Sequence, residues 1–467
     1  MNHFLSKLSY YSYIRIYIIF VLFYLEGNLG MLTCGQFSGW TSPSLSKLIE
    51  GNDAEYSIHL TNEEASWVAS LLMIGAVGGS ILCRFMVNAI GRKNTMLFTA
   101  VPSIISWLMI AFATSPWELY VSRFISGLSM GISYTVTPIY LGEISPADIR
   151  GNLTSMLTVA VKLGTLMEYV IGPFLSVQNL ALVSLISSCL FVIAFIWLPE
   201  TPYHLLCRNN RQKAINSLIQ LRGKKDIYEE IENIEQSVKA DLANETGFRE
   251  LLFVPGNRRA VIILVCLGGF QQMSGTQAAV QYAQIILDQA NTNLEGKYLT
   301  MILGVIQVIF TIICMFLIDH SGRKSLLIIS CLGAAFSTAM VATYFNLQYN
   351  HIDTSNIIWL PAIGVIMYII MYCSGLAPIF FTIASELFPT NVKALGTMTV
   401  LIITYIWAFS VLKFFLIIAD NNGVHVPFWI FTACSFIGAL FVFFYVPETK
   451  GKTLEQIQKE LRGSSMY

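Results

Sequence analysis

The chain has 467 residues, of which 55% are hydrophobic and only 12% are charged, and its formal net charge is zero. Soluble domains carry about 25% charged residues. The composition therefore excludes an ordinary soluble domain, and the balanced charge gives no indication of a nucleic-acid partner.

Apolar stretches of about 20 residues are candidate membrane spans, because about 30 Å of hydrocarbon needs that length of helix. The first stretch resembles a signal peptide, but it has no small-residue cleavage site and its apolar pattern continues past Glu26. We therefore expect a retained helix there. Twelve stretches follow one another, at residues 15–36, 66–88, 94–114, 117–142, 152–175, 180–198, 260–287, 298–318, 325–346, 357–384, 394–419 and 426–446.

Lys and Arg are distributed unevenly among the segments that connect these spans. With the N-terminus in the cytosol, nearly all of them fall in cytosolic segments, as the positive-inside rule requires. We therefore expect a multi-pass protein with both termini in the cytosol and the lipid bilayer around it. Nothing in the sequence requires an oligomer.

Three motifs occur twice, in the same order and at matching places. "NAIGRK" (88–93) matches "DHSGRK" (319–324), and "PETPY" (199–203) matches "PETKG" (447–451). "EISPADIRG", which begins at Glu143, matches "ELFPTNVKALG", which begins at Glu386. The chain is therefore a duplication of six helices, and two parallel six-helix halves can open one central site to each side in turn.

The repeat divides the chain into four parts. These are an N-terminal half (1–199), a charged cytosolic segment (200–256), a C-terminal half (257–447) and a cytosolic tail (448–467). In the cytosolic segment, Ile227, Ile231, Ile234 and Val238 recur at helical spacing. We expect that apolar face to pack against the cytosolic ends of the bundle.

Charged residues gather where the predicted helices reach the cytosol. Opposite charges there can pair across the two halves when the inner side closes and separate when it opens, each pair contributing about 1 kcal/mol. The alternative is that they merely mark the cytosolic face. The candidate gate charges are Arg92, Glu143, Arg150, Asp319, Arg323, Glu386 and Lys393.

Several chemistries lack their sequence signals. There is no G-x-x-x-x-G-K-[ST] loop for phosphates and no G-x-S-x-G elbow, and the histidines form no metal-ligand cluster. We therefore expect neither an enzyme nor an ATP-driven pump, and no cofactor or metal.

Taken together, the motifs resemble those of the sugar-porter family within the major facilitator superfamily. They are the two "GRK" loops, "RFISGLSMG", "YLGEISPADIRG", "PETPYHL", "FQQMSG", "ASELFP" and "PETKGKTLEQI". "GWTSPSL" and "LTNEEASWVASLL" resemble insect sugar and trehalose transporters. The resemblance implies the twelve-helix major facilitator fold, a small sugar such as glucose or trehalose as solute, and the plasma membrane.

A sugar is neutral, so its site needs uncharged hydrogen-bonding side chains and aromatic surface. The resemblance implies that Gln271 and Gln272 of "QQMSG" form a sugar-binding pair. Gln277 replaces an asparagine of the family, and Thr158 stands where the family has glutamine. The other positions that the resemblance implies are Gln307 and the aromatic residues Phe381 and Tyr405.

Charged residues well inside predicted spans include Glu26, Arg123, Lys162, Glu168 and Lys413. Each costs about 2.5–3.5 kcal/mol on insertion scales, so each needs a partner or water. We hypothesise that Lys162 pairs with Glu26 across the cavity. The related proton-coupled porters carry an aspartate near the level of Phe37, and phenylalanine cannot take a proton.

These features favour a facilitative sugar transporter that works by alternating access. Three alternatives stay open. A proton-coupled symporter could use one of the two intramembrane acids. A non-transporting sugar sensor is a second possibility, although the short terminal arms argue against it. The same machinery could also carry an organic ion.

Overall fold

A computed structural model describes residues 27–51, 56, 58–145, 150–223, 227–243, 248–290, 292, 294–452 and 454–463. In these ranges the elements are α-helices with short 3-10 and π segments. The chain is an all-α membrane protein with the twelve-helix, two-half major facilitator fold, as the sequence predicts.

The described part of the N-terminal half starts with helical residues 27–39, continued by α2 (Thr41–Glu50) after a turn at Trp40. Thr61 and Glu64 form a reciprocal capping box at the start of α3. The later helices are α3 (Asn62–Ile90), α4 (Arg92–Ala111), α5 (Pro116–Ile144), α6 (Arg150–Ile171) and α7 (Val177–Phe195). They match predicted spans two to six within several residues.

The C-terminal half differs from its predicted spans in two places. Span seven is broken into α12 (Pro255–Met273), α13 (Thr276–Gln281) and α14 (Ala283–Gln289). Span ten consists of α17 (Leu360–Met371), a π turn (Tyr372–Leu376) and α18 (Ala377–Leu387). The unbroken helices are α15 (Gly296–Ser321), α16 (Arg323–Tyr349), α19 (Thr390–Asn422) and α20 (His425–Tyr445).

The first break in span seven has a steric cause. Gly275 has φ of +95°, a left-handed conformation that glycine adopts without strain. A Cβ at this position would lie 2.4 Å from the ring of Phe431. The backbone therefore turns at a point where only hydrogen fits between α13 and α20.

In the described ranges, nine helices are long and apolar enough to cross a membrane. Three predicted spans are not among them. Most of the first lies outside the described residues, and the seventh is broken. The fourth is α5, which is 29 residues long but has buried serines and Arg123 in its core-facing side.

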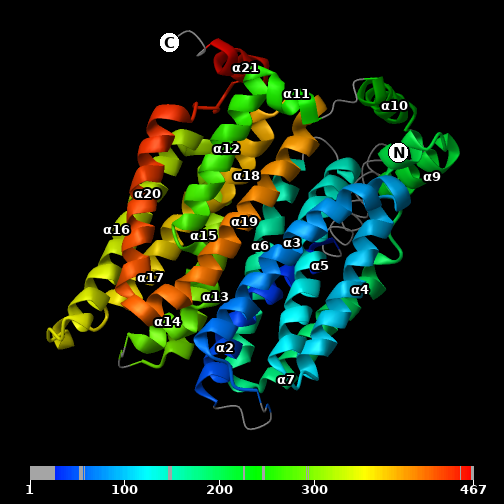
Figure 1. Ribbon diagram of the computed structural model, residues 1–467. Coiled ribbons are helices and arrows are strands. Elements are labelled where there is room, and N and C mark those ends of the chain that lie inside the picture. The colour runs from blue at the N-terminus through cyan, green and yellow to red at the C-terminus, as the bar shows by residue number, and fades with distance from the viewer. Residues whose placement is uncertain are drawn as a thin grey trace, which may run out of the picture.

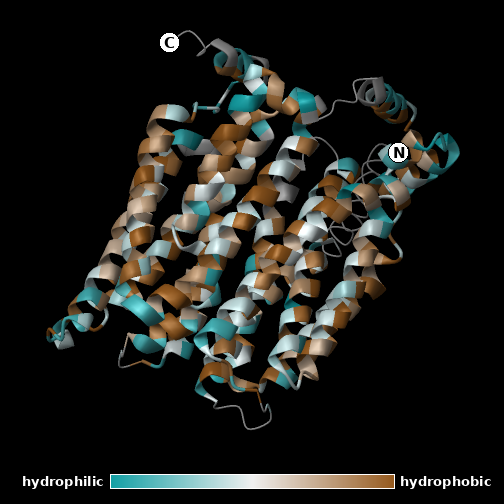
Figure 2. Cartoon of the chain, viewed as in Figure 1, coloured by the Kyte–Doolittle hydropathy of each residue, from teal (hydrophilic) through white to brown (hydrophobic). Residues whose placement is uncertain are grey.

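Helices of the two halves stand side by side, with α3 to α7 in one group and α12 to α20 in the other (Figure 1). We call the end with the loops at Gly91 and Gly322 the GRK end, and the end with α2 and α14 the far end. Hydrophobic residues occur along the lengths of the helices and hydrophilic ones gather at the ends (Figure 2), and many large hydrophobic side chains of these helices are exposed. Such a surface suits a lipid environment.

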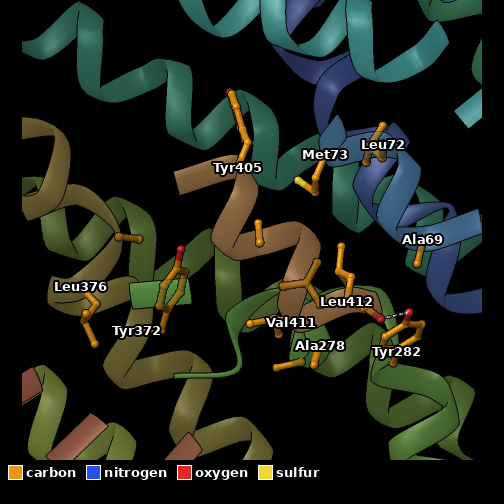
Figure 3. Close-up of a cluster of buried hydrophobic side chains, with 14 of the residues drawn as sticks. Ala69, Leu72, Met73, Ala278, Tyr282, Tyr372, Leu376, Tyr405, Val411 and Leu412 are labelled. Atoms are coloured by element: carbon orange, nitrogen blue, oxygen red, sulfur yellow. Dashed lines mark hydrogen bonds between the residues drawn. The ribbon is translucent and has the colours of Figure 1, made fainter. Parts of the chain in front are cut away.

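The buried core is continuous between the halves only in part. One cluster joins residues of α3 to residues of α13 and α19, and Figure 3 shows Leu72 and Met73 near Val411 and Leu412. A second cluster, which includes Val87, Tyr140 and Phe195, belongs to the N-terminal half and the adjoining α9.

The predicted cytosolic segment forms α8 (Pro202–Cys207), α9 (Arg211–Arg222), α10 (Tyr228–Ala243) and α11 (Phe248–Phe253), and α21 (Leu454–Gly463) follows α20. Ile231 and Val238 are buried, as their spacing predicts, but they pack with Leu206 and Leu218 of α8 and α9. The expectation that this face packs against the bundle ends was wrong, because the short helices provide an apolar surface of their own.

Candidate functional site

Hydrogen bonds join the two halves from mid-helix to the far end. They are the backbone N–H of Gln284 to Ser42 Oγ (3.0 Å), Ser46 Oγ to Asp288 (3.4 Å), Asn62 to Asp420 (3.1 Å), Lys413 to Ser66 (2.9 Å), Lys162 to Gln307 (3.0 Å) and Tyr169 to the Val280 carbonyl (2.5 Å). The far end is therefore held closed in this structure.

Four glutamines of the broken span lie in its first two helices, two in α12 and two in α13. Gln271 is buried and donates from Nε2 to the Leu376 carbonyl of the π turn at 3.0 Å. Gln272 is also buried, and its Oε1 has no partner among the described residues. Gln281 donates to Gln277 Oε1 at 3.2 Å, as their spacing on one helix predicts. The Oε1 of Gln281 likewise lacks a described partner.

Gln307 of α15 is fully buried and accepts a hydrogen bond from Lys162 Nζ of α6 at 3.0 Å. The ammonium also lies 5.8 Å from the centre of the Tyr372 ring. The hypothesised partner Glu26 lies outside the described residues. Lys162 thus reaches across the halves to an amide and an aromatic ring, and Tyr169 of α6 is a further hydrogen-bond partner of the Gln307 side chain.

The remaining predicted sugar contacts differ in burial. Tyr405 is 8% exposed, and its hydroxyl has no partner among the described residues. Its side chain points away from Val411 and Leu412 on the same helix (Figure 3). Thr158 is half-buried. Phe381 remains 42% exposed and contacts buried Phe380 edge to face.

Arg123 is fully buried, and neutral groups satisfy its guanidinium. It donates to the carbonyls of Val68 (3.1 Å) and Phe37 (2.8 Å) and to the Thr41 hydroxyl (2.9 Å). The Trp40 ring lies 5.2 Å away. The charge is therefore stabilised by dipoles and a π face rather than by a carboxylate among these contacts.

Glu168 is buried within the N-terminal half. One of its oxygens accepts a hydrogen bond from Ser184 at 2.6 Å, and the Gln36 side chain is a second hydrogen-bond partner of the carboxylate. The Cβ of Glu168 packs so closely on Gly39 that a Cβ on that glycine would lie 3.0 Å from it. Glu168 therefore sits between helices of one half rather than beside Lys162.

At the GRK end, the two predicted gate arginines pair within their own halves. Arg92 contacts Glu143 Oε1 through both Nε and Nη2 at 3.1 Å, and Arg323 contacts Glu386 at 3.4 Å. Lys393 is half-buried. The side chains of Arg150 and Asp319 lie outside the described residues. Pairing across the halves stays a prediction for a state that is closed at this end.

Arg92 also contacts the short helix α8. Its Nη1 lies 2.8 Å from Nδ1 of His204, and its guanidinium lies 5.5 Å from the Tyr203 ring. Burial, together with the nearby charge of Arg92, holds the pKa of His204 below its ordinary value. The imidazole is therefore neutral and Nδ1 accepts from the guanidinium.

The glutamates of the "PET" motifs have a structural role that the sequence analysis missed. Glu200 accepts from the backbone N–H groups of Arg92 and Lys93 at 3.0–3.2 Å. Glu448 accepts from those of Arg323 and Lys324 at 3.0 Å. Each carboxylate thus caps the helix that begins with the GRK loop of its own half, where a negative charge is favoured.

The signal for these caps was present in the repeat itself. A "GRK" and a "PET" occur once in each half, and such a pair indicates that the two motifs meet in space. At Glu448, burial acts to raise the pKa, but the N–H groups of Lys450, Arg323, Lys324 and Thr449 outweigh it and hold the pKa below the ordinary 4.5.

A family model described as "Sugar (and other) transporter" matches residues 28–461. The chain belongs to this family. It is 33% identical over 439 residues to a facilitated trehalose transporter Tret1 of Polypedilum vanderplanki, covering 93% of this chain and 86% of the relative. It is 34% identical over 447 residues to the Tret1 of Drosophila mojavensis, covering 95% of this chain and 51% of that protein. The chain thus spans about half the length of several curated relatives.

Solved structures share the fold. An inward-open structure of the xylose transporter XylE from E. coli gives a TM-score of 0.78 at 23% identity, covering 95% of this chain and 99% of that one. A POT family transporter bound to 5-aminolevulinic acid gives 0.66 at 15% identity, with 92% and 96% covered. At these identities the likeness concerns the arrangement of the helices alone.

Proposed function

We propose that this member of the sugar transporter family carries a small neutral sugar, a hexose or trehalose, down its gradient by alternating access, without catalysing a reaction. The observation that carries the proposal is the set of buried uncharged polar atoms without described partners in α12, α13 and α19. They are Gln272 Oε1, Gln281 Oε1 and the Tyr405 hydroxyl. Buried polar groups normally have partners, and sugar hydroxyls can both donate and accept.

The contacts between the halves support a direction for access. They hold the far end closed, whereas the arginines at the GRK end pair within their halves. We propose that the GRK end faces the cytosol with both termini, that the membrane is the plasma membrane, and that a second state breaks the far-end bonds. A two-state change of this kind needs a bias of only a few kcal/mol.

Arg123 bears on proton coupling. Its hydrogen bonds go to two carbonyls and a hydroxyl, and an aromatic ring lies nearby. Glu168 of the same half interacts with its charge without being hydrogen-bonded to it. We favour facilitated diffusion over symport because the hydrogen bonds of Arg123 among the described residues do not include a carboxylate. Names of the relatives agree with trehalose as solute, since those proteins are called facilitated trehalose transporters.

The test is uptake of labelled trehalose and labelled glucose into proteoliposomes, with and without an inward proton gradient. We expect uptake of at least one sugar that reaches equilibrium and ignores the gradient. Accumulation that needs the gradient would replace facilitation by symport. Binding of sugar without any uptake would instead support a sensor.

A further inference from the structure

A cavity of about 710 Å³ lies at the far end, and Ser46, Asn62 and Asp288, which take part in the hydrogen bonds between the halves, line it. Both halves contribute to its wall: Glu50 and Asn62 come from the N-terminal half, and Asp288, Gln348 and Tyr349 from the C-terminal half. The residues that we propose to bind sugar centrally do not line it. Its volume lies in the range of small-molecule sites, about 300–1,000 Å³.

The polar part of the wall is rich in hydrogen-bond acceptors. The hydroxyl of buried Ser46 lies 3.3 Å from Glu50 Oε1 and 3.4 Å from Asp288 Oδ2. One hydroxyl has one hydrogen and can donate to only one of the two carboxylates at a time. Each carboxylate can accept several hydrogen bonds, so the pair can take O–H donors from a ligand. The amides of Asn62 and Gln348 add both donors and acceptors.

Aromatic side chains form another part of the wall. Phe345 is buried, whereas Tyr349 is 60% exposed and packs against His425 with ring centres 4.8 Å apart. A sugar ring presents C–H groups on its faces and hydroxyls around its edge. Carboxylates and amides can bind the edge while an exposed aromatic ring covers a face. An organic ammonium ion would use the carboxylates and rings but would leave the amides without a role.

We propose that this cavity is a second sugar-binding site, separate from the central glutamines and open at the face opposite the GRK end. For the class of solute the proposal rests on the proposed function. Because residues of both halves line the cavity, separation of the halves at the far end takes the site apart. A sugar bound there therefore stabilises the state in which the far end is closed, and it slows entry from that side.

The probe is trehalose that carries a bulky fluorophore and is added outside sealed proteoliposomes, so that it cannot pass through the central pathway. Fluorescence anisotropy measures its binding, with unlabelled trehalose as competitor. Tyr349→Ala and Gln348→Ala alter the cavity. Tyr298→Ala is the matched control, because Tyr298 is an exposed tyrosine of α15 that does not line the cavity. Gln272→Ala tests the central site.

We expect the unmodified protein to bind the conjugate saturably. Each cavity variant should bind it about tenfold more weakly, whereas the affinities of Tyr298→Ala and Gln272→Ala should stay within about twofold of the unmodified protein's. The conjugate should also slow trehalose entry in the unmodified protein. The proposal would be overturned if the unmodified protein showed no saturable binding. It would also be overturned if Gln272→Ala lost binding while the cavity variants kept it. Trehalose uptake without conjugate binding would contradict this second site alone. Conjugate binding without any sugar uptake would contradict the proposed transport alone.

Discussion

Adjacent glutamines of α12 should respond oppositely to the same substitution. Gln271 Nε2 donates to the Leu376 carbonyl in the π turn, whereas Gln272 Oε1 has no described partner. Gln271→Ala removes a buried hydrogen bond to that carbonyl, which costs about 0.5–1.5 kcal/mol of folding free energy. Gln272→Ala removes an unsatisfied polar atom, so we expect its stability to be unchanged or slightly higher.

Their effects on sugar binding should be reversed. If Gln272 Oε1 accepts a sugar hydroxyl, its loss removes a neutral hydrogen bond of about 0.5–1.5 kcal/mol, which weakens binding up to about tenfold. Thermal unfolding in detergent, read by a thiol-reactive dye, gives stability for both variants. Titration with the transported sugar gives affinity.

The two variants serve as controls for each other, because they differ by one position on the same helix. Equal destabilisation by both substitutions, with sugar affinity unchanged in Gln272→Ala, would refute the reasoning from hydrogen-bond partners. A fall in stability for Gln272→Ala alone would refute it as well, since it would mean that the amide has a structural partner.

Three further changes test the structure. Glu448→Gln should lower the free energy of unfolding at pH 7 by about 1 kcal/mol, a small value because the cap is partly exposed and screened. Since the pKa of Glu448 in the folded state is depressed, this difference should vanish as the pH falls through that pKa, below 4.5. Thermal melts at varied pH measure it. Gly275→Ala should lower the melting temperature through about 1–2 kcal/mol of left-handed strain and the clash with Phe431, and a normal melt would contradict the turn. Lys162→Met should weaken sugar binding in a titration and Lys162→Arg should restore part of it, because the cation positions Gln307; unaltered affinity in the first variant would contradict this role.

The composition and the internal repeat of the sequence predicted most of the architecture. The spans could be predicted from the sequence because a helix that crosses the hydrocarbon must form its own backbone hydrogen bonds and must contain few charged residues. Both properties depend only on the residues of that helix. The same holds for the apolar periodicity of Ile231 and Val238. The sequence did not predict which surface this apolar face packs against, because its packing on α8 and α9 depends on residues distant in sequence.

The candidate site shows the same division. Sequence reasoning identified Gln272, Gln307 and Tyr405 as polar or aromatic residues within spans, and the structure leaves polar atoms of Gln272 and Tyr405 without described partners. It could not find that Gln271 is occupied by a π-turn carbonyl or that Lys162 reaches Gln307. Those contacts depend on how each helix is rotated about its axis, and this rotation cannot be predicted from residue types alone.

By itself the sequence determined the number of spans, their duplication, and the residue types available for a neutral solute, because hydrophobicity and motif order are properties of the chain. Tertiary structure alone decided where helices break, which charges pair and which end is closed. Arg92 and Glu143 are 51 residues apart, and Ser46 and Asp288 are 242 apart. Contacts of such separation exist only once helices have packed, so their geometry follows from the assembled bundle.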